Sequence, residues 1–498
     1  MIFLTREHPV GSTLAMNIAH LKQTLGRSDD VVIREFEIGF DEPLKAAICF
    51  IQHLVNTDMI NQHIVGTLLS IPESFRLRPN ESEDGRLTAI QSRILSLSQA
   101  GVIQTMNEVF DGILSGETVL FVDGYGSAIS IASKEYESRS VEEPKTEAVR
   151  RGPREGFTED LPVNISLIRR RIKNPNLIFE NQTVGTQTRT TVCIAYIEGT
   201  AERQLVQEVR KRLNRIDTAS VLDSGQVEQW IEDHPFSFLA SVGNSEKPDI
   251  VAAKMLEGRV AILCEGSPVA LTLPHLFIEN LQNSEDYYSR VLIATFSRLL
   301  RIFAFFVSTA TPALYVALTT FHQEMIPTVL LVTMAASREG TPFPAFVETL
   351  LMGITFELLT EAGVRMPRPI GQTISIVGAL VLGQAAVEAG IVSSPMIIVT
   401  ALTGISSLIV PSLRSVNILF RMILIFLAGS FGGFGILIGF ILMLAHMCSL
   451  RSFGVLYMAP IAPIIWADIK DSLIRAPVRF LQKRPKSLAR RPRQGTTK

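Results

Sequence analysis

The residue types best able to do chemistry here are carboxylates and amides inside apolar stretches of the second half of the chain. Glu357 and Glu361 are four positions apart, and Gln384 and Glu388 repeat that spacing. Side chains at this spacing lie on one face of a helix. Ionisable groups are costly at the depth of a lipid bilayer, so they tend to face a pathway or a partner. Both pairs are therefore candidate pore or gating groups.

A stripe of hydroxyl residues follows these pairs. Ser393, Thr400, Thr403 and Ser407 fall on one face of an otherwise apolar helix. Such a stripe suits a wet pore, and we take Thr400, Thr403 and Ser407 as candidate lining groups. Hydrogen bonding between the helices of a bundle is the alternative, because Ser and Thr commonly provide it. Glu348 faces the other side of its helix, and we expect it to mark an interface.

A proline-punctuated connection at 310–344 carries two further candidates, His322 and Glu324. Its prolines are Pro312, Pro327, Pro342 and Pro344. Proline fixes φ and breaks helices, so the segment is either a hinge or gate, or a rigid interfacial connection.

Signatures of catalysis are missing from the sequence. It contains no GxxxxGK[ST] loop, GxGxxG, HExxH or GxSxG motif. The eight histidines do not pair at metal-ligand spacing, and the four cysteines are far apart. We therefore expect no cofactor, no metal site, no catalytic residues and no enzymatic activity.

Composition indicates a polar part joined to an apolar part. The chain has 498 residues, of which 47% are hydrophobic, and its mean hydropathy is +0.28. Residues 302–321 carry no charge and match the roughly 20 residues that cross a bilayer. Residues 370–390 and 391–411 are further candidate spans. Residues 343–361 form either a span with buried carboxylates or an interfacial helix.

The stretch 417–448 has one charge, Arg421, and is too long for a single upright helix. Glycines in its middle leave open one tilted helix or two halves that form a hairpin.

The two ends of the chain constrain the topology. The N-terminus shows no signal peptide, so we expect the first half to lie in the cytosol. The tail at 471–498 is basic, which favours a cytoplasmic position facing anionic lipid over a nucleic-acid patch. Both termini are then cytoplasmic, and we expect an even number of crossings, four or six.

The first half is typical of an α+β domain. Residues 118–129 and 259–271 each read as two apolar strands around an acid-Gly turn, which suggests two related subdomains or coincidental hairpins. The Arg-rich loop at 150–173 is either an anion site, or a solvated linker or domain–domain salt-bridge surface. The expected fold is an α+β cytosolic domain followed by an all-α polytopic membrane domain. The domain limits that we expect are 1–185, 186–285, 286–470 and 471–498.

Long motifs resemble a known family. They are VRRGPREGFTED (149–160), LYVALTTFHQEMIPT (314–328), AASREGTPFPAFVE (335–348), EAGVRMPRPIGQTISIVGALVLGQAAVEAGIVS (361–393) and RSFGVLYMAP (451–460). In this order they closely resemble the A subunit of GerA-type spore germinant receptors, along most of the chain.

The resemblance implies a protein of the spore inner membrane. Its partners would be a permease-like B subunit, which is thought to bind the nutrient, and a lipoprotein C subunit. The A subunit is thought to form a homo-oligomeric, nutrient-gated ion channel that triggers germination. A non-conducting scaffold or signalling subunit is the alternative, as is membership of a related stage V sporulation class. The resemblance supplies no catalytic residues.

Overall fold

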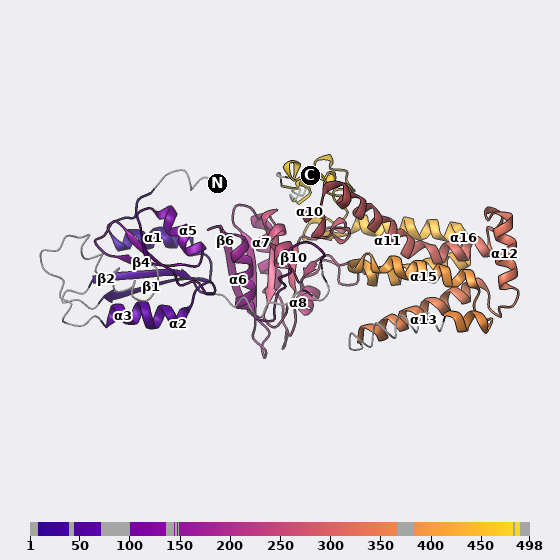
Figure 1. Cartoon of the computed structure of the whole chain (residues 1–498), viewed down its shortest axis with the longest axis horizontal. Coiled ribbons are helices and arrows are strands. Elements are labelled where there is room, and N and C mark those ends of the chain that lie inside the picture. The colour runs from indigo at the N-terminus through magenta and orange to yellow at the C-terminus, as the bar shows by residue number, and fades with distance from the viewer. Residues whose placement is uncertain are drawn as a thin grey trace, which may run out of the picture. The chain divides into compact units, whose positions relative to one another are not determined.

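The computed structural model describes residues 8–38, 44–70, 100–135, 144, 147, 149–365, 383–481 and 484–488. It divides into two compact units (Figure 1). An α+β unit comprises Met1–Pro235 and Val242–Pro274, and a helical unit comprises Phe236–Ser241 and His275–Lys498. The sequence predicted an α+β part followed by an all-α part, and the α+β and helical parts are confirmed; the helical unit also contains one short two-stranded sheet.

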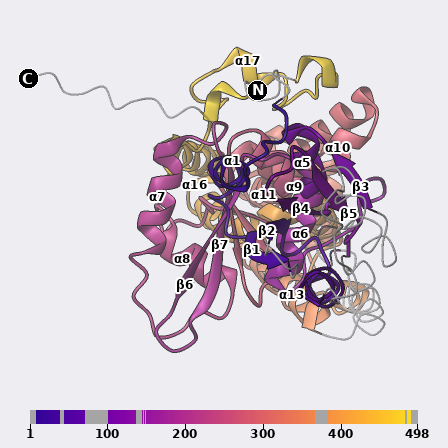
Figure 2. The same ribbon diagram turned by 90° about the vertical axis from the view of Figure 1, so that its left-hand side faces the viewer.

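The first sheet of the α+β unit has five antiparallel strands in the order β1-β2-β4-β5-β3 (Figures 1 and 2). The strands are β1 (Val31–Ile38), β2 (Leu44–Ile51), β3 (Ala100–Ile103), β4 (Thr118–Val122) and β5 (Ala128–Ile131). Alternate residues of β2 point to opposite faces. One face packs against α1 (Leu14–Thr24) and α5 (Met106–Leu114). The other packs against the helical segment α2, η1 and α3 (Thr57–Met59, Ile60–Val65, Gly66–Leu69).

The second sheet repeats this strand order as β6-β7-β9-β10-β8. Its strands are β6 (Leu177–Val184), β7 (Thr190–Ile197), β8 (Gly243–Ser245), β9 (Val260–Cys264) and β10 (Ala270–Leu273). Its helices are α6 (Leu161–Arg171), α7 (Arg203–Leu213), α8 (Ser224–Ile231) and α9 (Pro248–Leu256).

The strand register is also repeated. Ala46 pairs with Val122 in the first sheet, and the equivalent pair in the second is Val192 with Cys264. The hairpin turns use Gly124 at φ +88° and Gly266 at φ +80°, a region that favours glycine. Two related subdomains therefore explain the two hairpins better than coincidence does.

The predicted subdomain limit at residue 185 falls between β6 and β7, which pair along their whole length. Helix α6 and strand β6 therefore belong with the second sheet. We propose a limit before α6 instead, with the other domain limits kept as proposals.

A buried ion pair joins the two sheets of this unit. The Arg169 Nε lies 2.8 Å from Asp30 Oδ2, and both side chains are almost fully buried. Arg169 Nη2 also donates to Ser28 Oγ at 2.9 Å. The Ser28 Oγ in turn accepts from the backbone N–H of Phe179 on β6.

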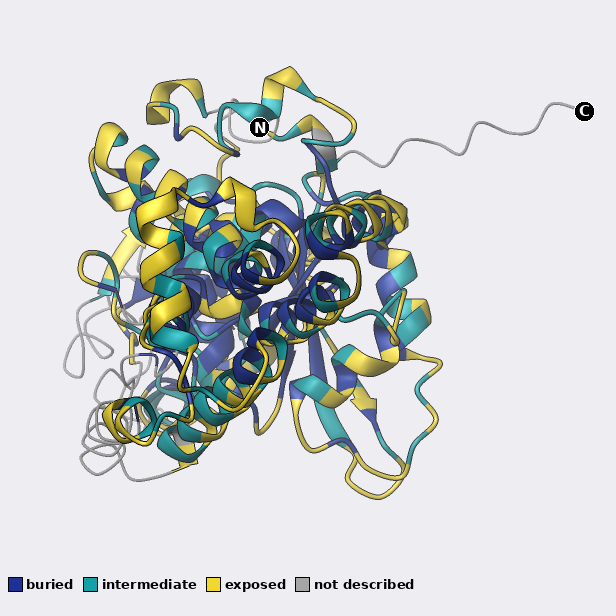
Figure 3. Cartoon of the chain, turned by 90° about the vertical axis from the view of Figure 1, so that its right-hand side faces the viewer, coloured by how far each residue is buried: buried dark blue, intermediate teal, exposed yellow. Residues whose placement is uncertain are grey.

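The helical unit contains long apolar helices whose buried residues face one another (Figure 3). They are α11 (Val291–Thr320), α13 (Ala345–Arg365), α15 (Ser394–Leu408) and α16 (Arg414–Ser449). The shorter α12 (Thr328–Arg338) has no buried residue. Shorter elements are η2 (Phe277–Leu281), α10 (Glu285–Tyr288), η3 (Gln323–Met325), η4 (Pro411–Leu413), β11 (Arg451–Ser452), β12 (Val455–Leu456), α17 (Trp466–Ile469), η5 (Val478–Phe480) and η6 (Lys486–Leu488). Two described stretches, Val291–Thr320 and Pro411–Ser449, have the length and apolarity of membrane spans.

Helix α16 is a hairpin of two halves. Its backbone is non-helical at Gly432, with φ 61° and ψ −142°. A Cβ built on Gly439 would lie only 2.5 Å from Leu424 Cδ2, whereas positions so far apart in a straight helix are separated by about 22 Å. Both ends also meet one loop, because Ser412 donates to the Asn280 carbonyl at 2.8 Å and Ser452 accepts from the His275 N–H at 2.9 Å.

Contacts along the α16 hairpin show in which direction α13 runs beside it. At its tip, a Cβ on Gly429 would meet the ring of Phe346, which lies at the start of α13. Further from the tip, Arg421 pairs with Glu357 in the middle of α13. Helix α13 therefore runs away from the tip. Residues 366–382, which include most of the predicted span 370–390, lie outside the described residues.

Candidate functional site

A buried ion pair lies between apolar helices of the helical unit. Arg421 of α16 pairs with Glu357 of α13, and their side chains are 3% and 22% exposed. The Arg421 Nε has no hydrogen-bond partner. A charge buried among apolar groups is stable only when paired, so each partner requires the other.

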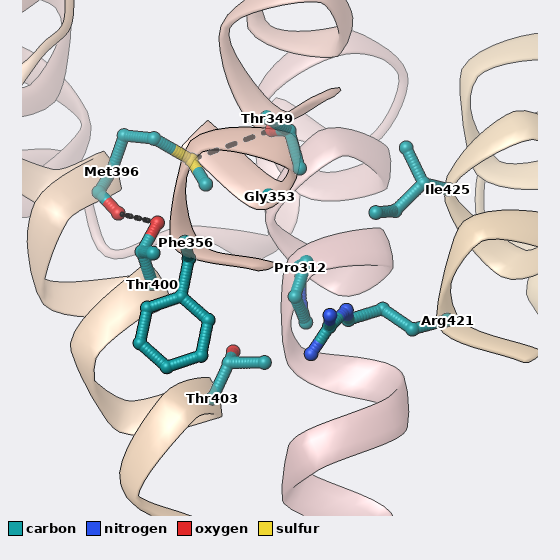
Figure 4. A pocket seen from close by; sticks show the side chains of 9 residues that line it. All are labelled: Pro312, Thr349, Gly353, Phe356, Met396, Thr400, Thr403, Arg421 and Ile425. Carbon is teal, nitrogen blue, oxygen red and sulfur yellow. Dashed lines mark hydrogen bonds between the residues drawn. The ribbon is translucent and has the colours of Figure 1, made fainter. Parts of the chain in front are cut away.

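The pair borders a small pocket between α11, α13, α15 and α16 (Figure 4). Its lining residues are Pro312, Thr349, Gly353, Phe356, Met396, Thr400, Thr403, Arg421 and Ile425. Figure 4 shows Arg421 reaching toward Pro312 and Thr403. The pocket has room for about one water molecule. It is therefore a small, mostly apolar gap in the packing, too small for an organic ligand.

The hydroxyl stripe of α15 bonds mostly to its own helix. Thr400, Thr403 and Ser407 donate to the carbonyls of Met396, Val399 and Gly404 at 2.9, 2.7 and 2.7 Å. Thr403 and Ser407 are buried, and Thr400 is half-buried. Only Ser393, just before α15, bonds to another helix, with its Oγ 3.2 Å from the Tyr315 hydroxyl.

The structure keeps one predicted polar pair on the surface and divides the other. Gln384 and Glu388 lie on a helical turn at 383–388, and both are exposed. Glu361 is exposed and accepts from Arg365 Nη2 at 2.6 Å, whereas Glu357 turns inward to Arg421.

His322 contacts the tip of the α16 hairpin. Its Nε2 accepts from the Gly433 backbone N–H at 3.1 Å. The first N–H groups of a helix have no partner within that helix, so His322 caps the second half of α16. Glu324 is exposed on η3, one turn further along the chain.

Sequence reasoning missed a buried network around Glu348, which it expected only to mark an interface. Glu348 is fully buried, and its Oε1 accepts from both the backbone N–H and the Oγ of Ser393 at 2.5 Å. The Nε of Arg338 on α12 lies 3.9 Å from Glu348 Oε2. A carboxylate at a helix N-terminus is favourable, and here it ties α13 to α15 and α12. The available signal was an acid in an apolar helix soon after an arginine.

A second missed network lies where α11 begins. Arg298 is 1% exposed, and its Nε lies 2.9 Å from Asp286 Oδ2. Its Nη1 lies 3.0 Å from Asp471 Oδ1, and Arg301 also pairs with Asp286. The sequence separation between Arg298 and Asp471 hides this contact from any local pattern.

Within the described part of the chain, no group of three His, Cys, Asp or Glu residues could hold a metal ion.

Comparison with known proteins identifies relatives along nearly the whole chain. The family model for Bacillus/Clostridium GerA spore germination protein matches residues 19–487. Spore germination protein KA of Bacillus subtilis (strain 168) is 44% identical over 98% of this chain and 90% of the relative. A protein of the same organism described as uncharacterized membrane protein YfkQ is 41% identical over 97% of this chain and 93% of the relative.

A solved structure also matches. The N-terminal domain of the A subunit of the Bacillus megaterium spore germinant receptor GerK3 shares 32% sequence identity and a TM-score of 0.44 with this chain. The match covers 55% of this chain and 98% of that one.

Proposed function

Since the chain belongs to the GerA family of spore germination proteins, we propose that it is the A subunit of a nutrient germinant receptor in the spore inner membrane. There it forms, as a homo-oligomer, an ion channel whose opening starts germination. The observation that carries this proposal is the Arg421–Glu357 ion pair between apolar helices. Charged groups at bilayer depth are costly and generally serve transport or its gating.

The exposed polar groups favour a pore between copies of the chain. A pore on an oligomer axis is lined by side chains that are exposed in the single subunit. Gln384 and Glu388 meet this condition. Thr403 and Ser407 are buried within one chain, so under this proposal they support the lining helix, and Thr400 lies at the boundary.

Helix directions support six crossings. Helix α11 leads toward the hairpin tip, where His322 meets Gly433. Helix α13 runs away from it, and so does α15, which begins beside Glu348 and ends near η4. The two halves of α16 run to the tip and back. If the predicted span 370–390, most of which lies outside the described residues, is counted as one more crossing, the proposed count is six, with both termini on the cytoplasmic side.

Gating would act at the tip. His322 holds the start of the second half of α16, next to the non-helical Gly432. A permease-like B subunit and a lipoprotein C subunit are the proposed partners, and nutrient binding would favour the open arrangement through differential contacts.

Flux from liposomes tests the proposal. The purified chain, alone and with its partner subunits, is reconstituted with trapped K⁺, and K⁺ release is followed. A channel releases K⁺ in at least one of these preparations, and Glu388→Gln reduces the release. The matched control, Glu35→Gln, removes an exposed acid of the α+β unit, which lies outside the proposed pore, and leaves release unchanged. No release in any preparation contradicts a channel and favours the scaffold alternative.

A further inference from the structure

A C-terminal segment, residues 464–480, lies against the beginning of α11. Its anchor is Asp471, whose carboxylate bonds to Arg298 at 3.0 Å and accepts from the Tyr287 hydroxyl at 2.9 Å. The Asp471 carbonyl accepts from Gln282 Nε2 at 2.6 Å. These bonds hold the segment against the start of α11.

Large apolar side chains project outward from this surface. On the segment, Trp466 is 79% exposed and Phe480 is 66% exposed. On the adjoining turns of α11, Leu292 and Phe296 are also exposed. Tryptophan concentrates where a membrane meets water, because its amphipathic ring suits the headgroup region.

Beyond Asp471, the charged side chains of this end of the chain are all basic. Arg479, Arg484 and Lys486 are exposed, and the sequence from Ser472 to Lys498 contains no acidic residue. Such a basic surface complements an anionic one.

Arg475, a buried cation of this segment, is a second, independent observation that points to an anionic ligand. It is 3% exposed, yet none of the described residues forms an ion pair with it. Its Nη2 donates to the Tyr287 carbonyl at 3.3 Å, its guanidinium lies 6.0 Å from the Tyr287 ring centroid, and its Nε has no partner. The neighbouring acids, Asp286 and Asp471, are already engaged by Arg298 and Arg301.

A buried cation without an anion is unfavourable, so Arg475 calls for an anionic group from outside the chain. Guanidinium groups bind phosphate through parallel N–H donors. The aromatic and aliphatic side chains around it fit acyl chains, which a free phosphate lacks.

We propose that residues 464–480 and the first turns of α11 form a binding surface for anionic phospholipid, with Arg475 and Arg479 holding the headgroup phosphate. This inference rests on the proposed placement of the helical unit in a membrane. It goes further in assigning a lipid class and the residues that select it.

Trp466 makes the proposal directly measurable. The chain has two tryptophans, Trp230 and Trp466, so Trp230→Phe leaves Trp466 as the single fluorophore. The full-length variant is placed in nanodiscs of phosphatidylcholine with increasing fractions of brominated phosphatidylglycerol. A parallel series uses brominated phosphatidylcholine, because bromine quenches tryptophan on contact.

The expected result is stronger quenching by the anionic lipid at equal mole fraction. Arg475→Gln and Arg479→Gln each lower the apparent affinity for it by about fivefold, the effect of one basic group near the surface. Arg475→Lys retains part of the preference and shows that folding is intact. The matched control is Arg203→Gln, an exposed arginine of α7, which changes nothing.

Equal quenching by both lipids would overturn the assigned lipid class. No quenching by either lipid, in a chain that enters the nanodisc, would overturn the lipid surface as a whole. A chain that does not enter nanodiscs at all would overturn the membrane placement as well, so failure of the proposed function is recognised separately.

Discussion

The ring of Phe238 stacks on the ring of His446, with centroids 5.0 Å apart and planes 28° from parallel. Ser237 Oγ lies 3.1 Å from His446 Nε2, and Leu239 is buried in the helical core. Phe236–Ser241 thus belongs to the helical unit, although the sequence on both sides of it belongs to the α+β unit. The chain therefore passes between the units at this segment as well as after Pro274.

We predict that Phe238→Ala loosens the second half of α16. Loss of the stack and its buried area lowers the local opening free energy by about 1–3 kcal/mol. Amide hydrogen exchange of residues 440–449 in the full chain measures this. Phe236→Ala is the matched control, because Phe236 is 102% exposed. Equal exchange in both variants would contradict the anchoring role of Phe238.

Arg169→Met should destabilise the α+β unit by about 3–5 kcal/mol, because it leaves Asp30 buried and unpaired. Denaturant titration of the full chain, with hydrogen exchange read at β1 and α6, reports the loss. Lys22→Met removes an exposed pair at 4.0 Å from Glu35 and should cost less than about 1 kcal/mol. Similar losses of stability in the two variants would contradict the stabilising role of the Arg169–Asp30 pair.

The same pair predicts acid sensitivity. Burial alone would raise the pKa of Asp30, but the charge and hydrogen bonds of Arg169, with the Ser28 hydroxyl, outweigh burial and lower it below the ordinary value of 3.8. A group whose pKa is lowered in the folded state adds stability at pH values above its unfolded-state pKa. That stability is lost as the pH falls through its folded-state pKa. The unit should therefore lose stability below about pH 4, whereas in Arg169→Met, where burial raises the pKa of Asp30, this acid-induced loss should be absent or reversed.

Glu228 of α8 predicts a pH dependence of opposite sign. Burial, reinforced by Glu232 and Asp223, raises its pKa from 4.5 to about 7. The folded state then favours the protonated form, so stability is present below pH 4.5 and declines as pH rises through 7. Glu228→Gln should remove about 1–2 kcal/mol of this decline, as judged by unfolding of the full chain at pH 5 and pH 8. An unchanged difference between these pH values would exclude Glu228 as its source.

The sequence predicted the order of an α+β part and a helical part because hydropathy and periodicity are local. It also suggested the repeat, since acid-Gly turns mark both hairpins. It could not find the Glu348–Ser393 contact or the Arg298–Asp471 contact, because partners distant in sequence leave no periodic signal. The division between Glu357, which turns inward, and Glu361, which faces outward, depends on helix packing rather than on spacing.

Glu348→Ala should destabilise the helical unit by about 2–3 kcal/mol, because the Ser393 N–H and hydroxyl lose a buried acceptor. Glu348→Gln keeps an acceptor and should cost less. Thermal unfolding in detergent, with hydrogen exchange at the start of α15, tests this. A Glu361→Ala control should be nearly neutral, and an equally mild Glu348→Ala would show that the network adds little.

Gly432→Ala should strain the hairpin tip. The residue has φ +61°, and an added Cβ would lie 2.9 Å from Phe321 Cβ and 3.1 Å from His322 Nε2. We expect the helical unit to lose about 1–2 kcal/mol of stability. We also expect faster exchange of the Gly433 N–H, which donates to His322 Nε2. Gly340→Ala, which meets nothing within 4 Å, is the control. Unchanged exchange at Gly433 would argue against a specific cap.

The most direct test of the channel is the reversal potential of the receptor in a planar bilayer under a KCl gradient. Glu388 is exposed in the single chain and is proposed to line the pore of the oligomer, where a ring of acids favours cations. Glu388→Lys should shift the reversal potential from the K⁺ side toward the Cl⁻ side. A current of normal size with an unchanged reversal potential would contradict a pore lined by Glu388.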